Sequence, residues 1–96
     1  MSEKERKILI IQNYFKDKPV DRVWLFGSYA RGDFSNSSDI DLLVDFNQTI
    51  SLLTQAKYII DLEEMLEIPV DIVPEDCLLP EIKPFVDQDK FLIYER

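Results

Sequence analysis

The sequence predicts an α/β fold, a small mixed β-sheet with helices packed on it, in a single domain spanning residues 1–96. Segments with helical hydrophobic spacing alternate with segments whose apolar residues recur at every second position, an order typical of α/β proteins. Apolar residues make up 46% of the chain, enough to form a hydrophobic core. We find no internal repeat, linker or low-complexity stretch, so nothing divides these 96 residues into two units.

The first part of the chain is expected to form a helix over residues 3–16 and a strand over residues 20–26. Ser2 and Glu5 have the spacing of a capping box at the start of the helix. Three apolar residues then recur at helical spacing: Ile8, Ile11 and Phe15. Pro19 ends the helix. The strand carries apolar side chains on both faces, which is typical of a central strand.

Two further strands are predicted from alternating side chains. Residues 39–46 show the clearest alternation. Their apolar face comprises Ile40, Leu42, Val44 and Phe46, and their other face Asp39, Asp41, Leu43 and Asp45. Residues 69–73 form a shorter strand. Its two faces carry Val70 with Ile72 and Asp71 with Val73.

A longer helix is expected over residues 52–66, after a turn at 47–51 that carries its N-cap. Its core-facing stripe is predicted to be Leu52, Ala56, Ile59, Leu62 and Leu66. Three prolines divide the chain beyond residue 73, and a helical turn or two is expected within residues 75–86. Residues 91–94 are apolar enough for a last strand or a packed tail.

The composition excludes several kinds of protein. With 19 acidic and 11 basic residues the net charge is −8, which disfavours nucleic acid as the main partner. The absence of histidine excludes His-based triads and His zinc sites. Cys77 has no cysteine partner, so we expect a small packed residue in a reducing cytoplasm. The N-terminal apolar run is too short for a signal peptide or a membrane span, so no membrane association is expected.

Both glycines of the chain, Gly27 and Gly32, flank one turn after the predicted strand 20–26. Glycine lets a backbone approach a ligand closely, and N–H groups at the start of a short helix can cradle phosphate. Ser28 adds a hydroxyl donor, and Arg31 adds a planar cation suited to a triphosphate. The turn is therefore a candidate phosphate site.

Carboxylates follow on the neighbouring strands. Asp39 and Asp41 point the same way, about 6.5 Å apart along a strand, and repel each other unless a cation lies between them. Oxygen ligands without His or Cys favour Mg²⁺ or Mn²⁺ over zinc. Asp71 on a neighbouring strand would complete a two-metal site, which suits in-line displacement at phosphorus.

The pattern Gly27-Ser28, ten residues, then Asp39-Ile40-Asp41 resembles the polymerase-β-type nucleotidyltransferase superfamily. The longer string Gly-Ser-Tyr-Ala-Arg-Gly … Ser-Asp-Ile-Asp-Leu-Leu-Val is similar to its minimal nucleotidyltransferase branch. The resemblance implies a polymerase-β-like core that uses Mg²⁺ and ATP. It implies metal-binding, catalytic roles for Asp39, Asp41 and Asp71, and nucleotide-binding roles for Gly27, Ser28, Arg31 and Ser38.

Many members of this branch are antitoxins encoded beside a helical HEPN-family RNase toxin, and some transfer AMP from ATP onto a toxin tyrosine. The resemblance therefore implies a cytoplasmic protein adenylyltransferase that forms a hetero-oligomer with such a toxin. Two alternatives stay open: a binding-only antitoxin that covers its toxin, and an enzyme that transfers a nucleotide to a small molecule.

Each candidate residue also has a purely structural interpretation. Asp39 and Asp41 could be solvated positions on an exposed strand face. Asp71 could be a charge that protects an edge strand from aggregation. Arg31 could be a surface cation, and Ser38 could supply loop polarity. The order and spacing of the turn and the carboxylates favour the functional interpretation.

Overall fold

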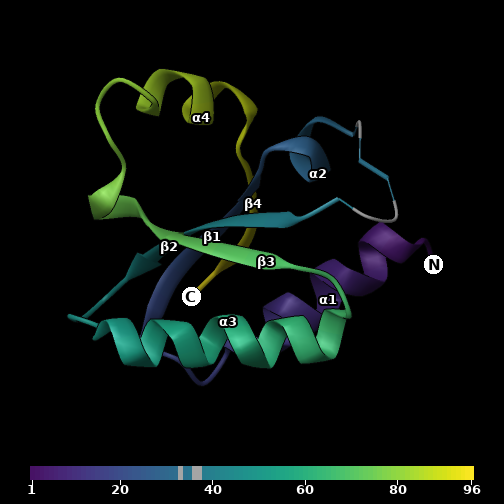
Figure 1. Cartoon of the computed structure of the whole chain (residues 1–96), viewed down its shortest axis with the longest axis horizontal. Coiled ribbons are helices and arrows are strands. Elements are labelled where there is room, and N and C mark those ends of the chain that lie inside the picture. Colours follow the sequence, from purple (N-terminus) through teal and green to yellow (C-terminus); the bar gives the residue numbers. More distant parts are fainter. Residues whose placement is uncertain (33, 36–37) are drawn as a thin grey trace.

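A four-stranded β-sheet with helices on both faces forms the body of the protein (Figure 1). The structure is a computed structural model that describes residues 1–32, 34–35 and 38–96. Along the chain the elements are α1 (Glu3–Phe15), β1 (Val20–Phe26), α2 (Ser28–Arg31), β2 (Ile40–Phe46), α3 (Leu52–Leu66), β3 (Val70–Pro74), the 3₁₀ turn η1 (Glu75–Cys77), α4 (Lys83–Asp89) and β4 (Phe91–Glu95). The loop predicted over residues 32–38 lies partly outside the described residues, at positions 33, 36 and 37.

The sheet is mixed, with the strand order β3-β2-β1-β4. β2 and β3 run parallel, while β1 is antiparallel to both of its neighbours. Because parallel strands need a crossover connection, α3 links β2 to β3. The predicted mixed sheet and the central position of the first strand are confirmed. This topology brings the start of β2, the start of β3 and the end of β1 to one end of the sheet.

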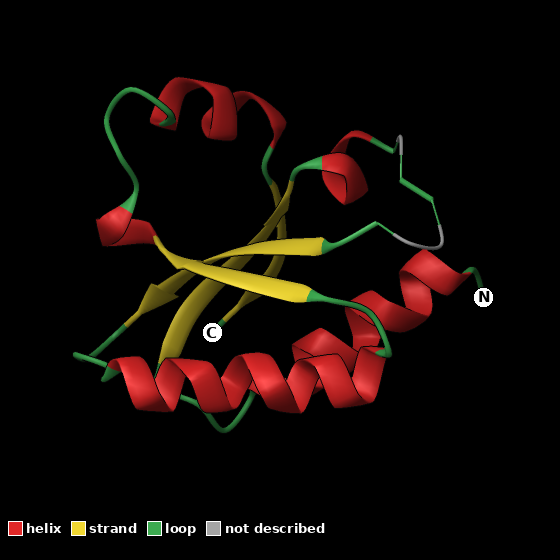
Figure 2. Ribbon diagram, in the orientation of Figure 1, coloured by secondary structure: helices red, strands yellow, loops and turns green. Residues whose placement is uncertain are grey.

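Helices α1 and α3 cover one face of the sheet, the lower one in Figure 2, and this face forms the main core. Ile11 and Phe15 of α1 and Leu62 of α3 are fully buried there. Burial of each such side chain stabilises the fold by about 1.5–3 kcal/mol. A hydrogen bond of 2.7 Å, donated by Tyr14 Oη to Asp61 Oδ2, joins the two helices at the rim of this core.

Side-chain caps set the starts of the two long helices. The N–H of Glu5 donates to Ser2 Oγ at 3.1 Å, and Ser2 Oγ donates to the Glu5 carboxylate at 3.1 Å. Ser51 caps α3, since its Oγ accepts the N–H of Thr54 at 3.1 Å. Both predicted helix starts are thereby confirmed, and the caps satisfy N–H groups that would otherwise lack partners.

The opposite face of the sheet has a thinner cover, made by η1 and α4 above the sheet in Figure 1. Trp24 of β1 and Leu43 of β2 pack there with Val86, the one buried residue of α4. Lys90 lies over the Trp24 ring, 4.8 Å from its centroid. Since side chains alternate along β2, Asp41 belongs to the same face as Leu43. The carboxylates therefore lie on the thinly covered face.

The predicted core stripe of α3 is wrong in its first half. Leu52 is 83% exposed and Ala56 is also exposed. The buried residues of the helix are Tyr58, Leu62 and Leu66. The ring of Tyr58 packs against Tyr14 and Phe46, which turns the helix so that its start projects apolar side chains outward.

Several other expectations need correction. β2 begins at Ile40, so Asp39 immediately precedes the strand. The helix predicted within residues 75–86 is divided into η1 and α4, and α4 continues to Asp89. Cys77 is exposed and not packed, because η1 ends at the surface. Across the described part of the chain, no helix combines the length and apolarity needed to cross a membrane.

Candidate active site

The turn after β1 has a backbone that glycine alone adopts readily. Gly27 has φ 73° and ψ −152°, a region that is strained for any residue with a Cβ. A Cβ at this position would also collide with the carboxylate of Asp41. Gly27 thus serves two purposes: it makes the turn, and it leaves room for a carboxylate against the backbone.

Helix α2 grows directly out of this turn. The N–H groups of Ala30 and Arg31 both donate to the carbonyl oxygen of Gly27 at 3.1 Å. Gly32 is the C-cap of the helix and has the left-handed conformation, with φ 85°. Its N–H donates to the carbonyl oxygen of Ser28 at 2.9 Å. The two glycines therefore bound the short helix that presents Ser28 and Arg31.

The register of the sheet brings the carboxylates together. Asp41 pairs with Phe26 at the end of β1 and with Asp71 at the start of β3. Directly paired residues on neighbouring strands have adjacent side chains on one face. Asp39 precedes β2 by one residue, so it lies at the same end of the sheet. Asp41 is partly buried, whereas Asp39 and Asp71 are exposed.

The electrostatics of Asp41 reflect this crowding. Partial burial raises the pKa of its carboxyl above the ordinary value, and the negative charges of Asp71 and then Asp39 raise that pKa further. The guanidinium of Arg31 acts in the opposite direction. Three carboxylates therefore share a region with too little positive charge, an arrangement that favours binding of a cation.

The donor set suits a hard divalent ion, since all three candidates offer carboxylate oxygens. The side chains are nevertheless not gathered around one point. Among the described residues, no group of three or more His, Cys, Asp or Glu side chains is placed to hold a metal ion. The pair that the structure brings side by side is Asp41 and Asp71, with Asp39 close enough to affect the pKa of Asp41.

Arg31 faces an element that sequence reasoning did not connect with the site. Its Nη1 lies 3.6 Å from Oδ2 of Asp89 at the end of α4. A pocket of about 230 Å³ adjoins this contact and is lined by Phe26, Gly27, Arg31, Phe85, Val86 and Asp89. No local pattern in residues 83–89 signals this, because the position of α4 depends on how the chain returns across the sheet.

The two serines predicted to bind nucleotide, Ser28 and Ser38, lie at different places in the structure. Ser28 is the first residue of α2 and is partly exposed beside Gly27. Ser38 immediately precedes Asp39, and its Oγ accepts the N–H of Ser35 at 2.8 Å. The N–H of Ser38 in turn donates to the carbonyl oxygen of Ser35 at 3.1 Å. Ser38 thus organises the loop that delivers Asp39.

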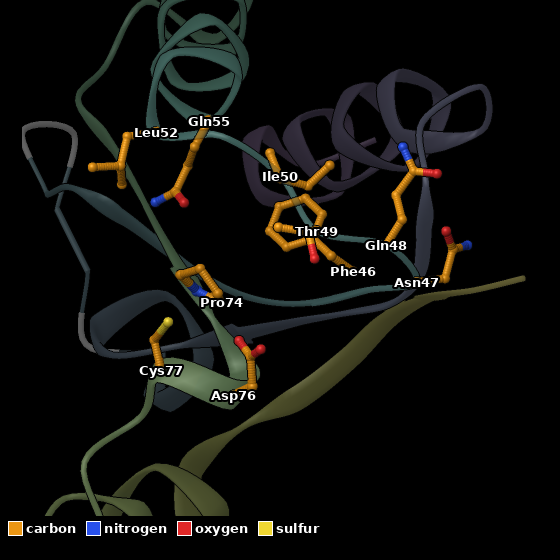
Figure 3. A pocket seen from close by; sticks show the side chains of 10 residues that line it. All are labelled: Phe46, Asn47, Gln48, Thr49, Ile50, Leu52, Gln55, Pro74, Asp76 and Cys77. Carbon is orange, nitrogen blue, oxygen red and sulfur yellow. The ribbon is translucent and has the colours of Figure 1, made fainter.

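A larger pocket, of about 470 Å³, lies at the other end of the sheet (Figure 3). Phe46 at the end of β2 and Pro74 at the end of β3 form part of its wall, with Gln55 of α3 and Cys77 nearby. The side chain of Gln55 donates to the carbonyl oxygen of Ile72 at 3.1 Å. This pocket is lined by none of Asp39, Asp41 and Asp71, so it lies apart from the candidate site.

A glycine turn that receives a carboxylate from the next strand, on a small mixed sheet, fits an enzyme that transfers nucleotides. The chain belongs to the nucleotidyltransferase domain family, whose model matches residues 8–94. It is 38% identical over 76 residues to a Methanocaldococcus jannaschii protein provisionally named a protein adenylyltransferase, covering 78% of this chain and 76% of that protein. It is 41% identical over 59 residues to the protein adenylyltransferase MntA of Thermococcus cleftensis, covering 62% of this chain and 60% of that protein.

Solved structures share the fold. A provisionally named minimal nucleotidyltransferase is 32% identical, with a TM-score of 0.67 and 95% of each chain covered. A toxin–antitoxin complex with AMP-PNP has a chain with a TM-score of 0.74 at 23% identity, covering 100% of this chain and 75% of that one. These matches confirm the polymerase-β-like nucleotidyltransferase core and the resemblance to the minimal branch.

Proposed function

We propose that this chain uses Mg²⁺ and ATP to transfer AMP to a hydroxyl of a partner protein, and that the partner is a HEPN-family toxin that it neutralises. The observation that carries the proposal is the position of Asp41, which lies against the Gly27 turn on one side and beside Asp71 on the other. A candidate phosphate site and a candidate metal site thereby meet at one residue.

The residues divide into two groups in this proposal. Asp39, Asp41 and Asp71 would hold Mg²⁺, which would supply charge to offset the phosphates and to polarise the attacking hydroxyl. The turn at Gly27, the Ser28 hydroxyl and the Arg31 guanidinium hold the triphosphate. Ser38 fixes the loop before Asp39 through its hydrogen bonds to Ser35.

The reaction transfers one adenylyl group. The acceptor oxygen forms a bond to the α-phosphorus of ATP while the bond from that phosphorus to the pyrophosphate oxygen breaks. Pyrophosphate leaves, and the hydroxyl proton passes to the carboxylate of Asp71 and then to water. Asp71 suits this task because it is exposed, whereas Asp41 is partly buried beneath the turn.

Three observations support a protein as the acceptor. The relatives from Methanocaldococcus jannaschii and Thermococcus cleftensis are named as protein adenylyltransferases. The fold also matches a chain in a complex of a tri-AMPylated Shewanella oneidensis HEPN toxin with its antitoxin, at 19% identity and a TM-score of 0.78. The net charge of −8 further favours a basic protein surface over nucleic acid.

The test uses the purified chain, Mg²⁺, ATP labelled at the α-phosphate, and a purified HEPN-family protein as the candidate partner. We expect label on a hydroxyl side chain of the partner, located by mass spectrometry. Asp41→Asn should lower the rate by about 100-fold or more, since it removes a carboxylate from the reacting centre. Asp45→Asn is the matched control: Asp45 lies on the same strand but pairs with Arg22 at 2.8 Å, away from the turn.

Each other outcome has a distinct meaning. Absence of label on the partner with the unsubstituted chain would refute adenylyl transfer to that protein. A labelled small molecule formed without the partner would establish the small-molecule alternative. If an Asp39→Asn/Asp41→Asn chain neutralises the toxin in cells as well as the unsubstituted chain does, the protein acts by binding alone.

A further inference from the structure

Residues 79–85 cross above the thinly covered face of the sheet and carry an apolar stripe on their outer side. Leu79 is 57% exposed, Ile82 45% and Phe85 69%. The N–H of Ile82 donates to the carbonyl oxygen of Leu79 at 3.0 Å, and the N–H of Phe85 donates to the carbonyl oxygen of Ile82 at 3.0 Å. Hydrogen bonds from residue i+3 to residue i stack side chains three positions apart on one line. The three residues therefore form a continuous ridge, here called the α4 ridge.

The α4 ridge adjoins the candidate active site. Phe85 lines the same pocket as Gly27 and Arg31. The next residue, Val86, is buried against Trp24 and Leu43, so it anchors the segment while Phe85 stays at the surface. The α4 ridge therefore borders the pocket beside the Gly27 turn.

The surroundings of the α4 ridge are acidic. Residues 75–89 contain five acidic residues and one basic residue, a net charge of −4. Lys83 and Lys90 pair with Asp87, and Arg31 faces Asp89. The other acidic residues of the segment, Glu75, Asp76 and Glu81, form no ion pair in the described part of the chain. An apolar ridge with an acidic border fits an apolar surface with a basic border.

We propose that the α4 ridge is the docking surface for the acceptor protein, and that the contacting surface of that protein is apolar with basic residues at its rim. This inference rests on the proposed function, because it assigns a protein acceptor to the site. Phe85 is the central anchor: it is aromatic, exposed, and placed at the mouth of the pocket. Docking there brings the acceptor to the pocket beside the Gly27 turn.

The test compares Phe85→Ala with Leu53→Ala in the full-length chain. Leu53 is 83% exposed on α3, on the far side of the sheet, so its removal is a matched loss of exposed apolar surface. Affinity for the purified HEPN-family partner is measured by calorimetry, and affinity for a non-hydrolysable ATP analogue with Mg²⁺ is measured separately. We expect Phe85→Ala to weaken partner binding by about ten-fold or more, with analogue binding unchanged and Leu53→Ala without effect.

A charge variant tests the acidic border independently. Glu81→Lys should slow association with the partner several-fold at low salt, with the difference shrinking as salt rises, because exposed charges act mainly on the association rate. Thermal unfolding of each variant checks that the fold is retained.

The outcomes separate this inference from the proposed function. Loss of analogue binding in Phe85→Ala with unchanged partner binding would show that Phe85 stacks on the nucleotide, which overturns docking. Equal partner affinity in Phe85→Ala and the unsubstituted chain, or a loss confined to Leu53→Ala, would also overturn it. If the unsubstituted chain binds the partner through Phe85 but transfers no label, docking stands and the transfer reaction fails.

Discussion

Substitution of Gly27 by alanine tests the connection between the turn and the carboxylates proposed to bind metal. The backbone at Gly27, φ 73° and ψ −152°, costs a residue with a Cβ about 1–3 kcal/mol. A cost of about 2 kcal/mol would lower Tm by about 8–16 °C in a domain of this size. The new Cβ would also push the carboxylate of Asp41 away from the turn. Since a displacement of about 1 Å at a reacting centre can cost about 100-fold in rate, we expect a loss of that size.

Gly32→Ala is the matched control for this experiment. Gly32 has φ 85° and ψ 5°, also strained for alanine, but a Cβ there has no heavy atom within 4 Å. The Gly32→Ala variant should lose about 1 kcal/mol of stability and keep its activity within a few-fold of the unsubstituted chain. Urea denaturation measures the free energy of unfolding, and transfer of labelled AMP at saturating ATP measures the rate. Equal activity in the two variants would refute the argument that Gly27 makes room for Asp41.

Three other substitutions test single interactions. Asp41→Asn should raise the free energy of unfolding at pH 7, because burial raises the pKa of Asp41 in the folded state and ionisation of Asp41 therefore opposes folding as pH rises through that pKa. Urea denaturation at a series of pH values should show this gain vanish below the pKa of an aspartate in the unfolded chain, about 3.9. A gain that persists there would contradict a raised pKa for Asp41 in the folded state. Tyr14→Phe, which removes the 2.7 Å hydrogen bond to Asp61, should lower stability by about 1 kcal/mol in a thermal melt, and an unchanged Tm would show that the bond contributes nothing. Asp89→Asn should strengthen ATP-analogue binding by up to about five-fold, since in the proposed site Asp89 would compete with phosphate for Arg31. Weaker binding would show that Asp89 positions Arg31 instead.

The local patterns of the chain predicted much of this structure. The alternation in residues 39–46 and the capping box at Ser2 depend on near neighbours, and the structure contains both. Gly27 directly follows β1 and Asp41 lies on β2, and these two strands are adjacent both in sequence and in the sheet.

The burial of α3 could not be predicted by the same reasoning. Hydrophobic spacing indicates an apolar stripe but not which side of the helix meets the sheet. Leu52 and Ala56 fit the helical period and yet face solvent, while Tyr58 is buried through its contacts with Tyr14 and Phe46. Packing between distant segments decided the orientation.

The sequence by itself determined the ingredients of the site: a glycine turn, a pair of carboxylates at fixed spacing, and a third carboxylate on another strand. The tertiary structure alone decided that Asp71 lies directly beside Asp41, that Asp89 faces Arg31, and that Phe85 stands at the pocket mouth. The physical reason is that strand register and the path of α4 depend on contacts between residues far apart in the chain. Local periodicity places side chains on a face, and long-range packing decides what that face meets.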